Sequence, residues 1–154
     1  MDALDQKILF VLQREGRITN AELAQRIGLT PGPTLARVNR LESSGVISRY
    51  VALLDRKSIG LPVTAFVSVI LKSHGRETSR GFVDAVSELP EVLECHHIAG
   101  EEDYLLKVVA ESPSDYESFV LNKLMEVADL QRVKTTFVLS SPKCTTAVPV
   151  AEIP

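Results

Sequence analysis

Three side chains at helical spacing, Arg37, Asn39 and Arg40, have the chemistry to contact DNA. In the major groove the pairing of arginine with guanine is the commonest specific contact, and arginine also binds phosphate. We expect these side chains on the outer face of one helix, where they would contact phosphates or base edges.

Thr30, Gly32 and Thr34 stand where this helix should begin. Because free backbone amides and the helix dipole favour anions at a helix start, the sequence predicts that these three residues contact phosphate. Pro33 has no amide hydrogen, so it removes one donor from this site.

A second candidate site is the acidic turn at residues 100–103, Gly-Glu-Glu-Asp. Gly100 permits unusual backbone angles, exposed amides can receive a carboxylate, and Asp103 can accept an ammonium group. Those two groups are the ends of a free amino acid. The alternative is a solvated hairpin tip that binds nothing.

The histidines predict no metal site. His96 and His97 are adjacent in a predicted strand, so they point to opposite faces and cannot bind one metal within a chain. We expect them in core or interface packing, and His74 in a loop. Metal-binding spacings, phosphate-binding glycine loops and nucleophile elbows are absent from the sequence, so we expect neither catalysis nor a cofactor.

The first group of polar residues must be positioned by two short helices and a turn. Thr19 and Glu22 have the spacing of a capping box, and Gly28 supplies a left-handed stop after the first helix. Thr30 followed by Pro31 then begins a second helix.

In this second helix, Leu35, Val38 and Leu41 are predicted to face inward and to leave the polar residues outside. This is the layout of a helix-turn-helix, although a helical hairpin inside a larger core would give the same pattern.

Another helix and a wing complete the first domain. An amphipathic helix is predicted before residue 16, and residues 46–54 have the β-branched and aromatic character of a strand or wing. We expect a winged helix-turn-helix domain at residues 1–54. The polar segment 55–62, with Gly60 and Pro62, is the expected linker.

Residues 63–154 are expected to form a second domain in which strands and helices alternate. Strands are predicted at residues 62–72, 92–99, 103–110 and 133–140, and helices at 76–89 and from Ser112 onward. The order β-α-β-β-α-β predicts a ferredoxin-like domain, and an α+β fold overall. Phe66 and Ile70 would lie on the sheet face that the helices leave open, which predicts dimerisation sheet to sheet.

Charge is divided unevenly along the 154 residues. Residues 1–60 carry nine basic and six acidic side chains, whereas residues 61–154 carry eight and fourteen. This asymmetry fits DNA binding by the first domain alone, with several copies needed for affinity.

The compartment is expected to be the cytoplasm. No apolar run approaches the roughly 20 residues that span a bilayer, and the N-terminus lacks the basic start of a signal peptide. Cys95 and Cys144 are therefore expected to be free thiols.

Together these segments resemble the Lrp/AsnC family, the leucine-responsive and asparagine-operon regulators also called feast/famine proteins. In the first domain the resemblance rests on residues 4–9 (LDQKIL), 16–47 and 50–55 (YVALLD). In the second it rests on residues 94–107 (ECHHIAGEEDYLLK) and 133–139 (VKTTFVL). It covers nearly the whole chain.

The resemblance implies a transcription regulator that dimerises, assembles further, often into octamers, and binds an amino acid in a RAM- or ACT-like domain. Two-fold pairing would give a pseudo-palindromic DNA site. The tail at residues 144–150 would form an extra edge strand. By match of position, the effector pocket would be lined by His97, Gly100, Glu101, Glu102, Asp103, Tyr104, Thr135 and Thr136.

Two other functions stay open from the sequence. The chain could be an amino-acid sensor or assembly module whose DNA binding is vestigial. It could also be an enzyme that uses His96 or His97, since sirohaem decarboxylases resemble the same architecture. An enzyme would leave the basic second helix unexplained.

Overall fold

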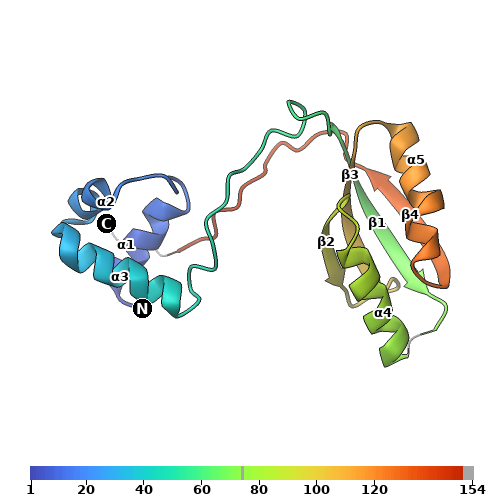
Figure 1. Cartoon of the computed structure of the whole chain (residues 1–154), viewed down its shortest axis with the longest axis horizontal. Helices are drawn as coiled ribbons and strands as arrows, with labels where there is room; N and C mark the ends of the chain where they lie inside the picture. The colour runs from blue at the N-terminus through green and yellow to red at the C-terminus, as the bar shows by residue number, and fades with distance from the viewer. Residues whose placement is uncertain (74, 151–154) are drawn as a thin grey trace. The chain divides into compact units, whose positions relative to one another are not determined.

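A computed structural model describes residues 1–73 and 75–150 (Figure 1). His74 and residues 151–154, the end of the predicted second domain, lie outside the described residues. The chain divides into two compact units. The first comprises Met1–Leu53 with the segment that begins at Lys143, and the second comprises Leu54–Pro142. The segment that begins at Lys143 thus lies in the first unit, whereas the sequence predicts a second domain that extends to residue 154.

Three helices build the first unit: α1 (Ala3–Leu12), α2 (Asn20–Ile27) and α3 (Pro31–Ser43). Their core is formed by the buried side chains of Ile8, Leu23, Ile27 and Leu41. Burying this apolar surface holds the three helices together, because helices this short are marginal in isolation.

The turn between α2 and α3 forms as its sequence predicts. Thr19 and Glu22 close a capping box at the start of α2. Gly28 has φ 74°, a left-handed angle that glycine adopts without strain. The Leu29 amide then donates to the Ala24 carbonyl oxygen at 2.9 Å, and this hydrogen bond caps the C-terminus of α2.

The predicted wing and the predicted edge strand are not formed. Residues 46–54 and 144–150 contain no strand within the described chain. At residues 46–54 composition misled the prediction, because a strand requires a hydrogen-bonded neighbour as well as β-forming residues. The strand at 144–150 was implied by the resemblance alone. The tail is instead fixed to α1: the Gln13 side-chain amide donates to the Val148 carbonyl and accepts from the Val148 amide, both at 2.9 Å.

The second unit has the predicted β-α-β-β-α-β order and confirms the ferredoxin-like, α+β prediction. Its elements are β1 (Val63–Leu71), α4 (Arg76–Ser87), β2 (Val92–His97), β3 (Tyr104–Ala110), α5 (Pro113–Asn122), the 3-10 helix η1 (Leu124–Glu126) and β4 (Leu130–Phe137). The strands form one antiparallel sheet in the order β2-β3-β1-β4. β4 begins three residues before its predicted start.

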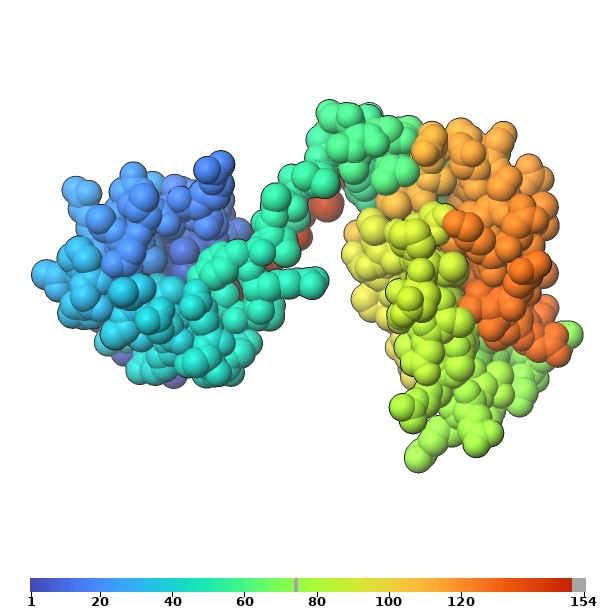
Figure 2. Space-filling model, in the orientation of Figure 1, coloured from blue at the N-terminus to red at the C-terminus, as the bar shows by residue number. Residues whose placement is uncertain are grey.

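Both helices of the second unit lie on one face of the sheet (Figures 1 and 2). The covered face supplies a core that includes Val67 and Val69 of β1, Leu106 of β3, Phe82 of α4 and Phe119 of α5. On this side the alternation of β1 is as predicted.

The other sheet face is open within the chain. Phe66 of β1 is exposed there. His96 lies 3.2 Å from the Glu94 carboxylate, which also accepts from Lys107 at 2.7 Å. His97, in contrast, packs on Tyr104 of the covered face, so the two histidines do point to opposite sides.

Candidate nucleic-acid interface and effector region

α3 presents to solvent a different face from the one that its sequence predicts. Thr34 is fully buried, and its hydroxyl donates to the Thr30 carbonyl oxygen at 2.9 Å. Leu35 is 49% exposed. The inward stripe is therefore Thr34, Val38 and Leu41. The predictions that Thr34 contacts phosphate and that Leu35 faces inward are wrong, because α3 is rotated to bring Arg37 toward α1.

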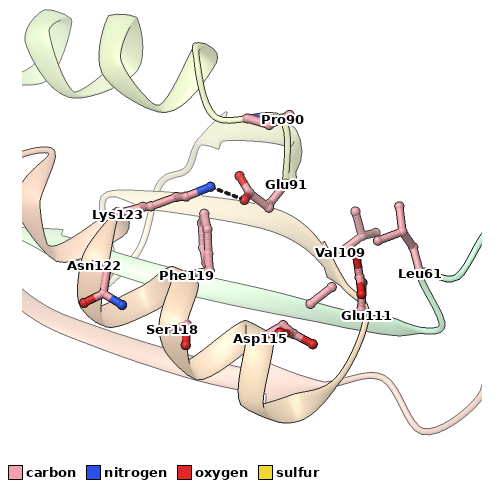
Figure 3. Close-up of a pocket in the computed structure, with 11 residues that line it drawn as sticks. Leu61, Pro90, Glu91, Val109, Glu111, Asp115, Ser118, Phe119, Asn122 and Lys123 are labelled. Atoms are coloured by element: carbon pink, nitrogen blue, oxygen red, sulfur yellow. Dashed lines mark hydrogen bonds and ion pairs between the residues drawn. The ribbon is translucent and has the colours of Figure 1, made fainter.

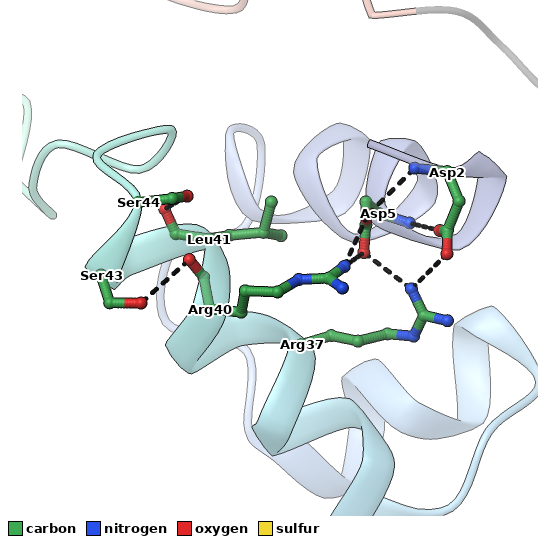
Figure 4. A network of polar contacts seen from close by, with 7 residues as sticks. All are labelled: Asp2, Asp5, Arg37, Arg40, Leu41, Ser43 and Ser44. Carbon is green, nitrogen blue, oxygen red and sulfur yellow. Dashed lines mark hydrogen bonds and ion pairs between the residues drawn. The ribbon is translucent and has the colours of Figure 1, made fainter.

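Arg37 and Arg40 reach from α3 to two carboxylates at the start of α1 (Figure 4). Asp5, which is only 1% exposed, accepts from Arg37 at 2.8 Å and from Arg40 at 2.7 and 2.8 Å. Asp2 accepts from Arg37 at 2.7 Å. The same two aspartates cap α1 reciprocally. We call these four residues the Asp–Arg cluster.

The Asp–Arg cluster changes what the two arginines offer to DNA. The Arg37 side chain is 25% exposed and turned to α1, contrary to its predicted outward position. Arg40 is 60% exposed, but one guanidinium nitrogen is bound to Asp5. Arg26 of α2 is likewise paired, with Glu15. Arg26, Arg37 and Arg40 are thus each engaged by a carboxylate of the same unit.

The cluster also shifts the pKa of its buried member. Burial alone would raise the pKa of the Asp5 carboxyl, but the Asp2 amide, the Arg37 guanidinium and the charge of Arg40 together lower it below its ordinary value. Hydrogen bonds to Asp2 and Asp5 in turn raise the pKa of Arg37. Asp5 is therefore held ionised in the fold.

We expect this shift to make the first unit sensitive to acid. A carboxyl whose pKa is lowered by folding contributes stability above its unfolded pKa, near 3.8, and loses it as the pH falls through the folded value. The hydrogen-exchange protection factors of α1 and α3, taken relative to the intrinsic exchange rate at each pH, should fall below about pH 4. The Asp5→Asn variant should lack this acid step, and an identical pH profile in that variant would contradict the assignment.

The centre of the outward face of α3 is made of short or uncharged side chains, and the charged residues Arg40 and Glu42 are exposed at its two edges. Positions three or four apart along the exposed side are Gly32, Ala36, Asn39 and Ser43, bordered by Leu35. Of the predicted contact residues, Gly32 and Asn39 lie at its centre and Arg40 lies at its edge.

The start of α3 offers one free amide. Pro31 and Pro33 have no amide hydrogen, so Gly32 is the single donor among the first three helical residues. Thr30 occupies the N-cap position without a side-chain cap bond. Asn20, which sequence reasoning missed, donates from its side chain to the Pro31 carbonyl at 2.8 Å and so fixes the start of α2 to that of α3.

The acidic turn between β2 and β3 is braced by β1. The Asp103 carboxylate accepts from the Leu71 amide at 2.8 Å, and the Asp103 amide donates to the Val69 carbonyl at 2.9 Å. Glu102 lies 3.8 Å from Lys134 of β4. Gly100 and Glu101 are exposed. Asp103 thus has a structural role that the sequence did not reveal.

Tyr104 is a core residue whose side chain lies under α4. Its ring centroid is 4.8 Å from that of Phe82 and 5.1 Å from that of His97, and its hydroxyl is hydrogen-bonded to Ser79. The Tyr104 side chain therefore faces the core, directly after the turn, and not the solvent.

Thr135 and Thr136 lie on opposite faces of β4. The Thr135 hydroxyl is 2.5 Å from the Tyr116 hydroxyl on the helix-covered side, whereas Thr136 is aligned with Phe66. They pair with residues 66 and 67 of β1, whereas the turn is bonded to Val69 and Leu71. One chain therefore does not bring both threonines to the turn.

A pocket of about 490 Å³ lies at the opposite end of β3 from the turn (Figure 3). Val109 and Phe119 supply its apolar wall, and an ion pair between Lys123 and Glu91 crosses its rim. Asp115 and Ser118 of α5 face it as well. It is separate from the predicted effector residues.

Comparison with known proteins defines the class. Residues 1–48 match the family model "Winged helix-turn-helix DNA-binding", and residues 64–148 match the model "Lrp/AsnC ligand binding domain". The chain belongs to the Lrp/AsnC family of transcriptional regulators, as its motifs predicted.

The relatives that match this chain over nearly its whole length are named as members of the same class. The transcriptional regulator AzlB of Bacillus subtilis is 35% identical, covering 99% of this chain and 98% of that protein. The leucine-responsive regulatory protein of Rhizobium meliloti is 38% identical, covering 93% and 92%. A transcriptional regulator of Neisseria meningitidis, solved in complex with L-Met, superposes with TM-score 0.93 at 38% identity, covering 97% of this chain and 96% of that one. All three are named as regulators.

Proposed function

We propose that this regulator binds DNA through the outward face of α3, as an oligomer whose assembly or DNA affinity responds to an amino acid. The observation that carries the DNA assignment is the α2-Gly28-α3 geometry, which leaves Gly32, Ala36 and Asn39 exposed in the position of a recognition helix. Its place of action would be the cytoplasm.

Contacts to phosphate would come from the edge of this face. The Gly32 amide and the Thr30 hydroxyl lie at the start of α3, and Arg40 lies at its flank with donors beyond those that bind Asp5. So few contacts give weak binding by one copy, which is why we propose that DNA is held by dimers on a pseudo-palindromic site.

The dimer would form through the open face of the sheet. Phe66 is exposed there and Ile70 is half-buried, on a face that an isolated sheet would keep polar. Further assembly, to an octamer, is the family's expected state. In such an assembly the turn of one chain would lie near the last strand of another. The turn and the threonines of β4, which lie apart within one chain, would then line the same pocket.

The effector would be an amino acid bound at the acidic turn. The Neisseria meningitidis relative holds L-Met, and a carboxylate such as that of Asp103 is a strong acceptor for an ammonium group. We propose that Asp103 accepts the ligand ammonium, and that Gly100 and Glu101 form the rim. Ligand would act by its differential affinity for two arrangements of the dimers.

Thermal shift with each of the twenty amino acids tests this assignment. A ligand at 100 times its dissociation constant stabilises the protein by about 2.7 kcal/mol. Asp103→Asn keeps an oxygen for the Leu71 amide but removes the charge, so it should weaken binding by at least about tenfold. Asp129→Asn, at an exposed ion pair, is the control and should bind normally. An unaltered ligand response in Asp103→Asn would contradict the role given to Asp103.

A further inference from the structure

The structure leaves the centre of the recognition surface without a basic side chain. Arg37 is turned to α1 and Arg40 lies at the edge of the outward face, where Asp5 holds one of its nitrogens. Reading of guanine in the major groove relies on arginine or lysine, which donate to its O6 and N7 acceptors. The outward face lacks that chemistry at its centre.

Two side chains of this face are suited to recognise an A·T base pair. Asn39 carries one amide donor and one acceptor, which complement N7 and the N6 amino group of adenine. Leu35 is an exposed apolar side chain on a surface helix, and the thymine methyl is the apolar group that the major groove presents.

The neighbours of these two residues allow a close approach. Gly32, Ala36 and Ser43 have short side chains and share the exposed side with Asn39. A helix surface without bulky side chains can lie deep in the groove, so the short side chain of Asn39 can reach a base edge.

We propose that this protein reads A·T base pairs in each half-site, with Asn39 recognising adenine and Leu35 contacting a thymine methyl group. The proposal rests on the proposed function, DNA binding by the outward face of α3, and names the bases that this face selects.

The test begins with selection of duplexes from random DNA by the full-length protein. Single-atom changes are then made in the selected half-site. Replacing the contacted adenine by 7-deazaadenine removes N7 and should weaken wild-type binding about fivefold, and Asn39→Ala should not respond to that change. Replacing the contacted thymine by deoxyuridine removes the methyl group and should weaken wild-type binding about fourfold, and Leu35→Ala should not respond.

Leu121→Ala and Asn122→Ala are matched controls, because they make the same substitutions on α5 of the second unit, where Leu121 is 59% exposed. Both should keep the full response to the modified bases. Half-sites dominated by G·C pairs would overturn the proposal, as would Asn39→Ala and Leu35→Ala variants that respond like the wild type. Failure of the wild-type protein to enrich any sequence would contradict the proposed DNA binding itself.

Discussion

Asp5→Ala is expected to loosen the first unit and to abolish specific DNA binding. Asp5 is buried and accepts from both Arg37 and Arg40, so its removal breaks the link between α1 and α3. Breaking a buried ion pair costs 3–5 kcal/mol. We expect about 3 kcal/mol here, the lower end, because the exposed Arg40 can regain water.

Hydrogen exchange measured on the full-length protein resolves the two units and checks this expectation. In Asp5→Ala, amides of α1 and α3 should exchange faster by the factor that this free energy gives, roughly 100-fold, while β1 and β3 stay protected. Asp129→Ala, which breaks the exposed pair with Lys72, is the control and should leave the first unit unchanged. Wild-type protection of α3 in Asp5→Ala would show that the Asp–Arg cluster does not hold the helix.

The sequence predicted the elements of the helix-turn-helix but not which face of α3 points outward. Thr19, Glu22 and Gly28 act locally, so their spacing is sufficient to place the helices and the turn. The rotation of α3 is set by a contact 32 residues away, between Arg37 and Asp5. The sequence does indicate that Asp5 is buried. It stands three residues before the core residue Ile8, so the two lie on the same face of α1.

The errors in the effector region likewise come from contacts between residues that are far apart in the sequence. The order of strands and helices along the chain and the covered face of β1 follow from the periodicity of residue types and were predicted correctly. The pairing of residues 135 and 136 with residues 67 and 66 depends on strand register, which local sequence does not specify. Residues 46–54 have the composition of a strand, but strand formation depends on a partner that composition does not reveal.

If the outward face of α3 is the surface that contacts DNA, a negative charge placed on it by Ala36→Glu should strongly weaken binding. Ala36 is exposed near the middle of this face. Glutamate there keeps good helix propensity, so folding should be unaffected, but it places a negative charge against the phosphates and base edges. Juxtaposed like charges cost several kcal/mol, so binding should weaken by at least about 100-fold.

The measurement is the dissociation constant, by fluorescence anisotropy, for the duplex that the wild-type protein selects. Ser114→Glu adds the same charge at the exposed start of α5 in the second unit and serves as the control. We predict a loss of at least about 100-fold for Ala36→Glu and wild-type affinity for Ser114→Glu. Wild-type affinity in Ala36→Glu would contradict the account, because DNA would then be bound by another surface.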